Sequence, residues 1–323
     1  MPANLTPQYL EADRKFKAAT TPQDKLLALE EMLATIPKHK GTEKMQADLK
    51  RRIAKLRAQT QQRKGAARGR PSFHVDKEGA GQIVMVGAPN VGKSTVLHAL
   101  TNAQPEIADY PFTTRVPLPG MMTYENIQVQ LVDLPPITLE FSEGWLFAII
   151  RTADAAALVV DLSTDDLLAQ TEQVQSVLGQ AKLAIASAAR EPNEKRGLVL
   201  ANKLDAPGAA ARLVLLREFL GHRLPVFPVS ATYGTGVEEL RRALFEVLSV
   251  IRVYSKPPGR KADTATPFIL RRGATVLDAA EAIHRDFVAR LKYARLWGQD
   301  EYQGQMVGRD HVLEDGDVLE LHA

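Results

Sequence analysis

Apolar positions along the chain follow two different spacings, and from residue 81 onward these spacings alternate. Short apolar runs between turn residues predict buried strands, at Ile83–Val86, Ile127–Val132, Ala156–Val160, Leu198–Ala201 and Val226–Val229. Segments with helical length and patterning separate them, at Asp165–Ala184, Ala209–Leu220 and Val237–Val250. Strands that alternate with helices are typical of a mostly parallel sheet covered by helices, so we expect an α/β fold.

Two further regions flank this α/β segment. Residues 6–62 predict a helical hairpin, with apolar stripes at Leu26, Leu29, Leu33 and Ile36 and at Met45, Leu49, Ile53 and Leu56. Residues 255–267 have the composition of a linker, and a strand, a helix and short strands follow it. We therefore expect a helical extension over 1–70, an α/β domain over 71–255 and a small α+β domain over 264–323.

Composition excludes some functions and suggests a partner. The 323 residues contain no cysteine, which excludes disulfides, thiolate catalysis and cysteine–zinc sites. No apolar run reaches the roughly 18 residues of a membrane span, so we expect a cytoplasmic protein without a membrane partner. The helical extension is basic, because residues 38–70 hold 12 Lys or Arg against 2 Asp or Glu. This charge favours a polyanionic partner such as RNA; a solvated helix face is the alternative.

The segment GAPNVGKS, from Gly87 to Ser94, matches the phosphate-binding loop (P-loop) pattern G-x-x-x-x-G-K-[ST]. It follows an apolar strand and precedes a helical segment, which is the context this motif requires. Lys93 is expected along the β- and γ-phosphates, and the Ser94 hydroxyl on Mg²⁺. The predicted phosphate-binding residues are Gly87, Ala88, Pro89, Asn90, Val91, Gly92, Lys93, Ser94 and Thr95.

Two later loops predict that the base is guanine. In ANKLD (201–205), the Asp205 carboxylate can accept hydrogen bonds from guanine N1–H and the 2-amino group, which adenine does not offer. Asn202 can brace the loop, and the stem of Lys203 can lie over the base. In VSAT (229–232), the predicted contacts are Ser230, Ala231 and Thr232, with the Ala231 N–H directed at guanine O6. GTP and GDP are therefore the expected ligands, and an ATPase is the disfavoured alternative.

These motifs, in this order, resemble translation-factor-type GTPases. DYPFTT, residues 109–114, resembles the first switch of the Obg-related group. The C-terminal segments IRVYSKPPG, TVLDAAEAIHRDFVARLKYARLWG and VGRDHVLEDGDVLELH resemble the developmentally regulated GTP-binding (DRG) proteins, which end in a β-grasp TGS domain. The resemblance implies a P-loop GTPase domain between a helical hairpin and a small TGS domain.

The resemblance also implies roles for single residues. Thr114 would close on Mg²⁺ and the γ-phosphate, with Thr113 as a candidate second contact, and Asp133 would reach Mg²⁺ through a water. Asn90 would help to hold K⁺ beside the phosphates, although tolerance of a tight turn is the alternative role. Lys93, Thr114 and Asn90 are thus the expected catalytic residues. A ribosome or RNA partner is implied, and the TGS domain is a candidate surface for a protein partner.

The sequence departs from these relatives in VDLPPIT, residues 132–138. Pro136 stands where a glycine N–H would bond the γ-phosphate. Ile137 stands where a glutamine would orient the attacking water, although the resemblance to the Obg-related group itself implies an apolar residue there. Loss of one charge-assisted bond costs roughly 1.5–3 kcal/mol, so GTP should lose about 10–100-fold against GDP. We expect slow hydrolysis; a nucleotide-binding module without turnover is the alternative. Only 40 residues separate Asp161 from Asn202, too few for the domain that DRG proteins insert there.

Overall fold

The computed structural model describes residues 73–101, 116–139, 142–283, 288, 290–298 and 303–322, with scattered positions between 14 and 51; His222 is described by its backbone alone. The chain forms two compact units, residues 1–72 and 73–323. In the first unit the predicted stripe residues Leu29, Ile36 and Leu49 are buried. Most of the predicted helical hairpin lies outside the described residues. In the described part, no helix has the length and apolar character needed to cross a membrane.

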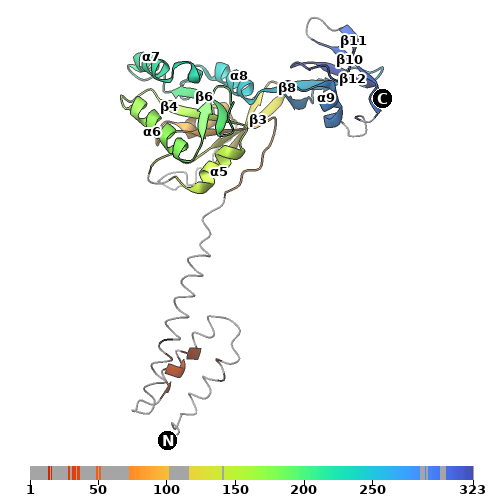
Figure 1. The fold of residues 1–323 in the computed structure, drawn as a ribbon. Coiled ribbons are helices and arrows are strands. Elements are labelled where there is room, and N and C mark those ends of the chain that lie inside the picture. Colours follow the sequence, from red (N-terminus) through yellow and green to blue (C-terminus); the bar gives the residue numbers. More distant parts are fainter. Residues whose placement is uncertain are drawn as a thin grey trace. The chain divides into compact units, whose positions relative to one another are not determined.

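The second unit begins with a seven-stranded sheet (Figure 1). Its strands are β1 (Gln82–Val86), β2 (Leu118–Tyr124), β3 (Ile127–Asp133), β4 (Ala155–Asp161), β5 (Ala184–Ala186), β6 (Glu194–Asn202) and β7 (Val226–Pro228). Their order is β2-β3-β1-β4-β6-β5, and β7 also pairs with β6. Every pairing is parallel except the β2–β3 hairpin. This confirms the α/β fold that the apolar runs predict.

Helices cover both faces of this sheet (Figure 1). They are α4 (Lys93–Leu100), α5 (Gly144–Thr152), α6 (Leu167–Gln180), α7 (Ala209–Leu220) and α8 (Val237–Leu248), with a short 3₁₀ turn η1 at Gly221–Arg223. Helix α4 packs beside α8, and α6 packs beside α7. The central strands β1 and β4 are buried along their whole length, so they read as continuous apolar runs.

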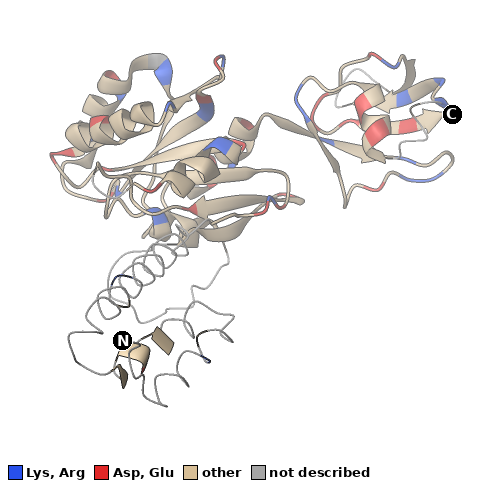
Figure 2. Cartoon of the chain, turned by 60° about the horizontal axis from the view of Figure 1, so that its bottom comes forward, with Lys and Arg blue, Asp and Glu red and all other residues tan. Residues whose placement is uncertain are grey.

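Charged residues of the central strands lie only at the strand ends (Figure 2). Strands β3 and β4 finish on Asp133 and Asp161, at the carboxyl edge of the parallel strands. Strand β6 instead begins with Glu194, Lys195 and Arg196, at the opposite, amino edge. The sheet therefore has two charged edges separated by an apolar interior.

The C-terminal sheet has five strands in the described part: β8 (Val250–Ser255), β9 (Phe268–Arg271), β10 (Tyr293–Trp297), β11 (Gln303–Val307) and β12 (Val318–His322). Their order is β11-β10-β12-β8-β9, and helix α9 (Val276–Ile283) packs against β9. Strand β8 pairs in parallel with β12. It therefore belongs to the C-terminal sheet, although its sequence position suggests the end of the preceding domain.

Strand β2 and helix α5 are among the elements that the sequence patterns do not predict. Strand β2 contains Pro119 and Gly120, which usually mark turns; the proline is tolerated because β2 is an edge strand. A Cβ at Gly120 would lie 3.0 Å from Leu97 Cδ1, so the glycine allows β2 to approach α4. Helix α5 follows the segment VDLPPIT, and its residues Leu146 and Ile149 are buried with helical spacing.

Candidate functional site

The P-loop connects β1 to α4 at the carboxyl edge of the sheet. Gly92 has φ 90° and Asn90 has φ 61°, in the left-handed region. A Cβ at Gly92 would lie 2.4 Å from Asn202 Nδ2, and one at Gly87 would lie 2.5 Å from the Val159 carbonyl oxygen. Both positions therefore require glycine, because the loop passes directly against β4 and against the loop that follows β6.

Lys93 is folded back over this loop. Its Nζ donates to the carbonyl oxygens of Gly87, at 3.4 Å, and Ala88, at 3.2 Å. Burial lowers the pKa of Lys93, and the charge of Asp133 opposes this shift. The ammonium group is thus held by weak neutral acceptors, which phosphate oxygens can replace with stronger charge-assisted bonds.

Asp133 and Ser94 form a pair of oxygen ligands beside the loop. Asp133 is 1% exposed, and its Oδ2 accepts a hydrogen bond from Ser94 Oγ at 2.5 Å. Its Oδ1 is buried and has no hydrogen-bond partner among the described residues. Burial raises the pKa of Asp133, and the Ser94 hydrogen bond and Lys93 oppose this shift. A buried carboxylate oxygen without a donor, next to a hydroxyl, suits Mg²⁺, which prefers oxygen ligands and retains waters.

Asn202 joins three loops. Its Nδ2 donates to the Val91 carbonyl oxygen of the P-loop at 3.1 Å, and its Oδ1 accepts from the Ala231 N–H at 3.3 Å. The Ala231 N–H, predicted to contact guanine O6, is therefore engaged with Asn202 in this structure. Asn202 is 2% exposed, so these bonds are shielded from water and fix the phosphate and guanine loops against each other.

Lys203 adds a second link between the loops. Its Nζ donates to the Asn90 carbonyl oxygen at 3.1 Å and to Asp161 Oδ2 at 2.5 Å. Burial alone would raise the pKa of Asp161, but hydrogen bonds from Lys203 and Ser163 lower it overall. Sequence reasoning did not include Asp161 in the site. Its signal is the same as that of Asp133, an aspartate that ends an apolar strand.

The predicted base-binding side chains lie at the rim. Asp205 and Thr232 are exposed, whereas Ser230 is buried and its Oγ donates to Asp205 Oδ1. Pro89, Asn90 and Thr95 are also exposed on the P-loop side. Asp205 thus has one oxygen held by the protein and faces solvent, where a base can reach it.

The segment after Asp133 is tied to the P-loop. The Ile137 N–H donates to the Gly87 carbonyl oxygen at 3.0 Å, and the Ile137 side chain is 1% exposed. Pro136 has no N–H to donate. Further along, Trp145 packs edge-to-face on Phe73, with ring centroids 4.6 Å apart. The Ile137 backbone and the Trp145 side chain therefore each anchor this region.

Thr114 and the rest of DYPFTT lie outside the described residues, so their predicted contact with Mg²⁺ stays a prediction. The remaining predicted site residues converge on one edge of one sheet. They come from four loops that follow β1, β3, β6 and β7.

Comparison with known proteins identifies the family. Residues 82–203 match a family model described as a 50S ribosome-binding GTPase, and residues 251–323 match the TGS domain model. A GTP-binding protein of Methanocaldococcus jannaschii is 31% identical over 93% of this chain and 92% of its own length. The human developmentally-regulated GTP-binding protein 2 is 28% identical over 92% of this chain and 98% of its own length. The chain belongs to the DRG family of GTP-binding proteins.

The fold agrees with this assignment. The YchF GTPase of Schizosaccharomyces pombe superimposes with a TM-score of 0.52 at 14% identity, over 77% of this chain and 100% of that chain. The alignment with the Methanocaldococcus jannaschii relative spans 361 residues, more than the 323 of this chain, so the relative has segments without a counterpart here. Between β4 and β6 this DRG protein has α6, β5 and loops, in agreement with the predicted lack of an inserted domain.

Proposed function

We propose that this DRG-family protein is a slow, Mg²⁺-dependent GTPase whose nucleotide state regulates docking on a ribosome or RNA. The observation that carries the proposal is the network of Asn202, which bonds to Val91 and to Ala231 and thereby joins the phosphate and guanine loops. Such preorganisation favours tight binding of a guanine nucleotide, because little ordering remains to be done on association.

The expected chemistry depends on position and charge. Lys93 would exchange its two carbonyl acceptors for phosphate oxygens, and Ser94, Asp133 and Thr114 would hold Mg²⁺. When bound, this ion neutralises negative charge on the phosphates. Ile137 replaces the residue that would orient the attacking water. Without that residue the water is positioned less well, so hydrolysis should be slow.

Sensing of the γ-phosphate is expected to be weak. Pro136 offers no N–H, and the next N–H, that of Ile137, is donated to Gly87. This supports a reduced preference for GTP over GDP, because only GTP would gain from such a donor. A missing charge-assisted bond of roughly 1.5–3 kcal/mol corresponds to about 10–100-fold in the ratio of the two affinities.

The direct test is calorimetry with GDP and a non-hydrolysable GTP analogue, on wild type and Pro136→Gly. We expect Pro136→Gly to raise analogue affinity by about tenfold and to leave GDP affinity unchanged. Pro135→Gly is the matched control, because it relaxes the same segment without placing an N–H at position 136. Equal affinity ratios in wild type and Pro136→Gly would contradict weak sensing.

Hydrolysis itself separates two functions. Multiple-turnover assays with and without K⁺ and ribosomes should show slow release of phosphate. The anchored Ile137 favours a second candidate, a module that binds guanine nucleotides without turnover. Retained GDP binding with no turnover in every condition would establish that module. Displacement of GDP by excess ATP would revive the disfavoured ATPase.

Asn90 gives a separate test of K⁺. Its left-handed φ of 61° already accounts for an asparagine in a tight turn. Asn90→Gly keeps that backbone accessible but removes the side-chain carbonyl. If K⁺ binds there, Asn90→Gly should retain nucleotide affinity and lose stimulation by K⁺ over Na⁺. If wild type hydrolyses GTP at equal rates in K⁺ and Na⁺, the remaining role of Asn90 is to allow the tight turn.

Docking on a ribosome is supported by the description of the matched family model and by the basic residues 38–70. We expect cosedimentation with large ribosomal subunits to differ between GTP analogue and GDP. Replacement of Lys50, Arg51 and Arg52 by glutamine should weaken binding to the ribosomal subunit and should reduce the salt dependence of that binding. Nucleotide-independent cosedimentation would show docking without regulation. A protein partner that binds the TGS domain remains compatible with either result.

A further inference from the structure

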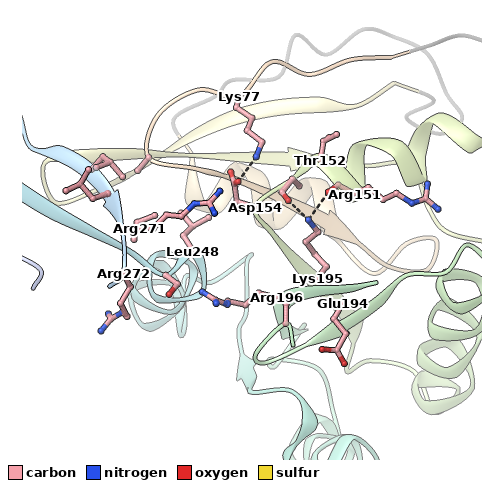
Figure 3. Close-up of a pocket in the computed structure, with 17 residues that line it drawn as sticks. Lys77, Arg151, Thr152, Asp154, Glu194, Lys195, Arg196, Leu248, Arg271 and Arg272 are labelled. Carbon is pink, nitrogen blue, oxygen red and sulfur yellow. Dashed lines mark hydrogen bonds and ion pairs between the residues drawn. The ribbon is translucent and has the colours of Figure 1, made fainter. Parts of the chain in front are cut away.

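A cavity of about 580 Å³ lies at the amino edge of the seven-stranded sheet (Figure 3). It is lined by residues that precede β1, by the end of α5 and the turn before β4, by the start of β6, by the end of α8, and by β8 and β9. Because β1, β4 and β6 are parallel, their starts lie at the edge opposite the nucleotide loops. The cavity is therefore separate from the P-loop.

The lining of this cavity is basic. It includes the six cations Lys77, Arg151, Lys195, Arg196, Arg271 and Arg272, against the two carboxylates Asp154 and Glu194. An excess of positive charge in a concave surface attracts anions and raises their local concentration.

Both carboxylates are already engaged. Asp154 Oδ1 accepts from Lys77 Nζ at 2.5 Å, and Asp154 Oδ2 accepts from the Gln82 N–H at 2.9 Å. Glu194 Oε2 accepts the N–H groups of Arg190, at 2.7 Å, and Glu191, at 3.1 Å, which lowers the pKa of Glu194. Neither acid is directed at the arginines that line the same cavity.

The cations fall into two groups. Lys195 Nζ donates to the carbonyl oxygens of Arg151, at 2.9 Å, and Ala153, at 2.5 Å, at the end of α5. Arg151 donates to the carbonyl oxygen of Ala181. Arg196, Arg271 and Arg272, in contrast, make no side-chain hydrogen bond or ion pair with the described residues. Figure 3 shows Arg196 and Arg271 extending toward the space beside Leu248, whereas Arg272 points away from it.

We propose that this cavity binds adjacent phosphate groups of a polyanion, with the guanidinium groups of Arg196 and Arg271 as the contacts. A guanidinium offers planar donors that match phosphate oxygens two at a time. The volume lies within the range of small-ligand sites, roughly 300–1,000 Å³, and suits a single-stranded backbone or a free polyphosphate rather than a duplex. Only the RNA source rests on the proposed function.

The test uses the full chain saturated with GDP and Mg²⁺, so that the P-loop is filled. Fluorescein-labelled 20-nucleotide oligouridine is titrated by anisotropy, and tripolyphosphate by calorimetry. Arg196→Gln/Arg271→Gln is compared with Arg217→Gln/Arg295→Gln, which removes the same charge from α7 and β10, outside the cavity. Arg196→Lys/Arg271→Lys keeps the positive charge but removes the planar pair of donors that a guanidinium offers. Circular dichroism checks that each variant is folded.

For a probe that uses the cavity, we expect the glutamine pair to weaken binding by about tenfold and the control pair much less. With oligouridine, loss of two contacts should reduce the slope of log affinity against log salt by about 1.4, at roughly 0.7 for each contact on a single strand. The lysine pair should fall between wild type and the glutamine pair. An effect on oligouridine alone identifies an RNA backbone, and an effect on tripolyphosphate alone identifies a free polyphosphate.

Equal effects of the glutamine pair and the control pair on both probes would overturn the site. GDP affinity, measured in parallel, should be the same in all variants, because the cavity lies at the other edge of the sheet. The two proposals fail separately. Absence of GTP turnover would contradict the proposed GTPase and leave the cavity unaffected, whereas a normal GTPase with no difference between the arginine pairs would contradict the cavity alone.

Discussion

The two edges of the seven-stranded sheet carry opposite kinds of unsatisfied group. At the carboxyl edge every lysine of the site has a partner: Lys93 bonds to P-loop carbonyls and Lys203 bonds to Asp161. Within the described part of the site, the buried side-chain oxygen that has no hydrogen-bond partner is Oδ1 of Asp133. At the amino edge the carboxylates that line the cavity have partners, whereas Arg196, Arg271 and Arg272 make no side-chain hydrogen bond or ion pair with the described residues.

This difference indicates what each edge can recruit. A buried carboxylate oxygen without a hydrogen-bond donor is stabilised by a cation, and at the carboxyl edge this cation would be the Mg²⁺ that binds together with the nucleotide. Guanidinium groups without a protein partner can bind the oxygens of an anion directly, so no metal ion is needed at the amino edge. The amino edge also holds the C-terminal domain, because Asn126, in the β2–β3 turn, donates to Tyr254 Oη at 2.8 Å. A ligand there would contact both domains.

The largest effect is expected from the guanine loop. Asp205→Ala removes the proposed acceptor of two base hydrogen bonds, each worth roughly 1.5–3 kcal/mol, so GDP affinity should fall by about 100-fold or more. Calorimetry measures this fall. Asp76→Ala is the control, because Asp76 is 90% exposed and precedes β1. A fall of less than about threefold in Asp205→Ala would mean that this loop does not read the base.

A smaller loss is expected from Gly92→Ala. The new Cβ would meet Asn202 Nδ2 at 2.4 Å and sit at φ 90°, so the link between P-loop and guanine loop must open. Strain and loss of that hydrogen bond cost roughly 2–3 kcal/mol, or about 30–150-fold in GDP affinity. Gly144→Ala is the control, since nothing lies within 4 Å of its added Cβ. Similar GDP affinities in the two variants would show that the link is dispensable.

Local patterns in the sequence predict the α/β core well. Buried parallel strands are continuous apolar runs, so β1, β3, β4, β6 and β7 are found from sequence, and α7 has the predicted bounds. Strand β8 lies inside the range expected for the α/β domain but pairs with β9 and β12, and no local pattern shows this because β12 is distant in sequence. Helix α5 is missed because Gly144 and the preceding prolines suggest a loop.

The site divides in the same way. The P-loop and the guanine loops are short motifs, so sequence alone places Lys93 and Asn202 correctly at one edge. The backbone hydrogen bond between Ile137 and Gly87 joins residues that are 50 apart in the sequence, and no local sequence pattern predicts it. Arg196 and Arg271 reach one cavity only because the β8–β9 hairpin folds back beside β6. Chemistry that depends on such tertiary contacts needs the structure.

A pH-dependent effect is expected at the amino edge, where Arg252 contacts Glu125 and bonds to Asp315 Oδ2 at 2.7 Å. Burial alone would raise the pKa of Asp315, but hydrogen bonds from Arg252 lower it overall. A lowered folded-state pKa stabilises the fold above the unfolded value of about 3.9 and is lost as pH falls through the folded value.

Asp315→Asn should therefore lower the free energy of unfolding by about 1 kcal/mol at pH 7, and the difference from wild type should shrink below about pH 4. Urea unfolding at pH 7, 5 and 3.5 measures it. Asp263→Asn, whose carboxylate bonds to Thr266 on an exposed loop, should show a smaller effect. A difference that grows on acidification would have the wrong sign for a carboxylate with a lowered pKa.

The smallest effect is expected at the cavity rim. Lys77 and Asp154 form an ion pair whose side chains are 45% and 34% exposed, so a double-mutant cycle with Lys77→Met and Asp154→Asn should give a coupling of about 0.2–1 kcal/mol that falls with salt. Asp154→Asn alone should cost more than Lys77→Met, because Asp154 also accepts the Gln82 N–H. Urea unfolding of the four proteins at low and high salt gives both quantities. A coupling above about 2 kcal/mol that resists salt would show a tightly bound pair, as at the carboxyl edge. Both edges would then contain tightly paired charges, and Arg196 and Arg271 alone would make the amino edge available to anions.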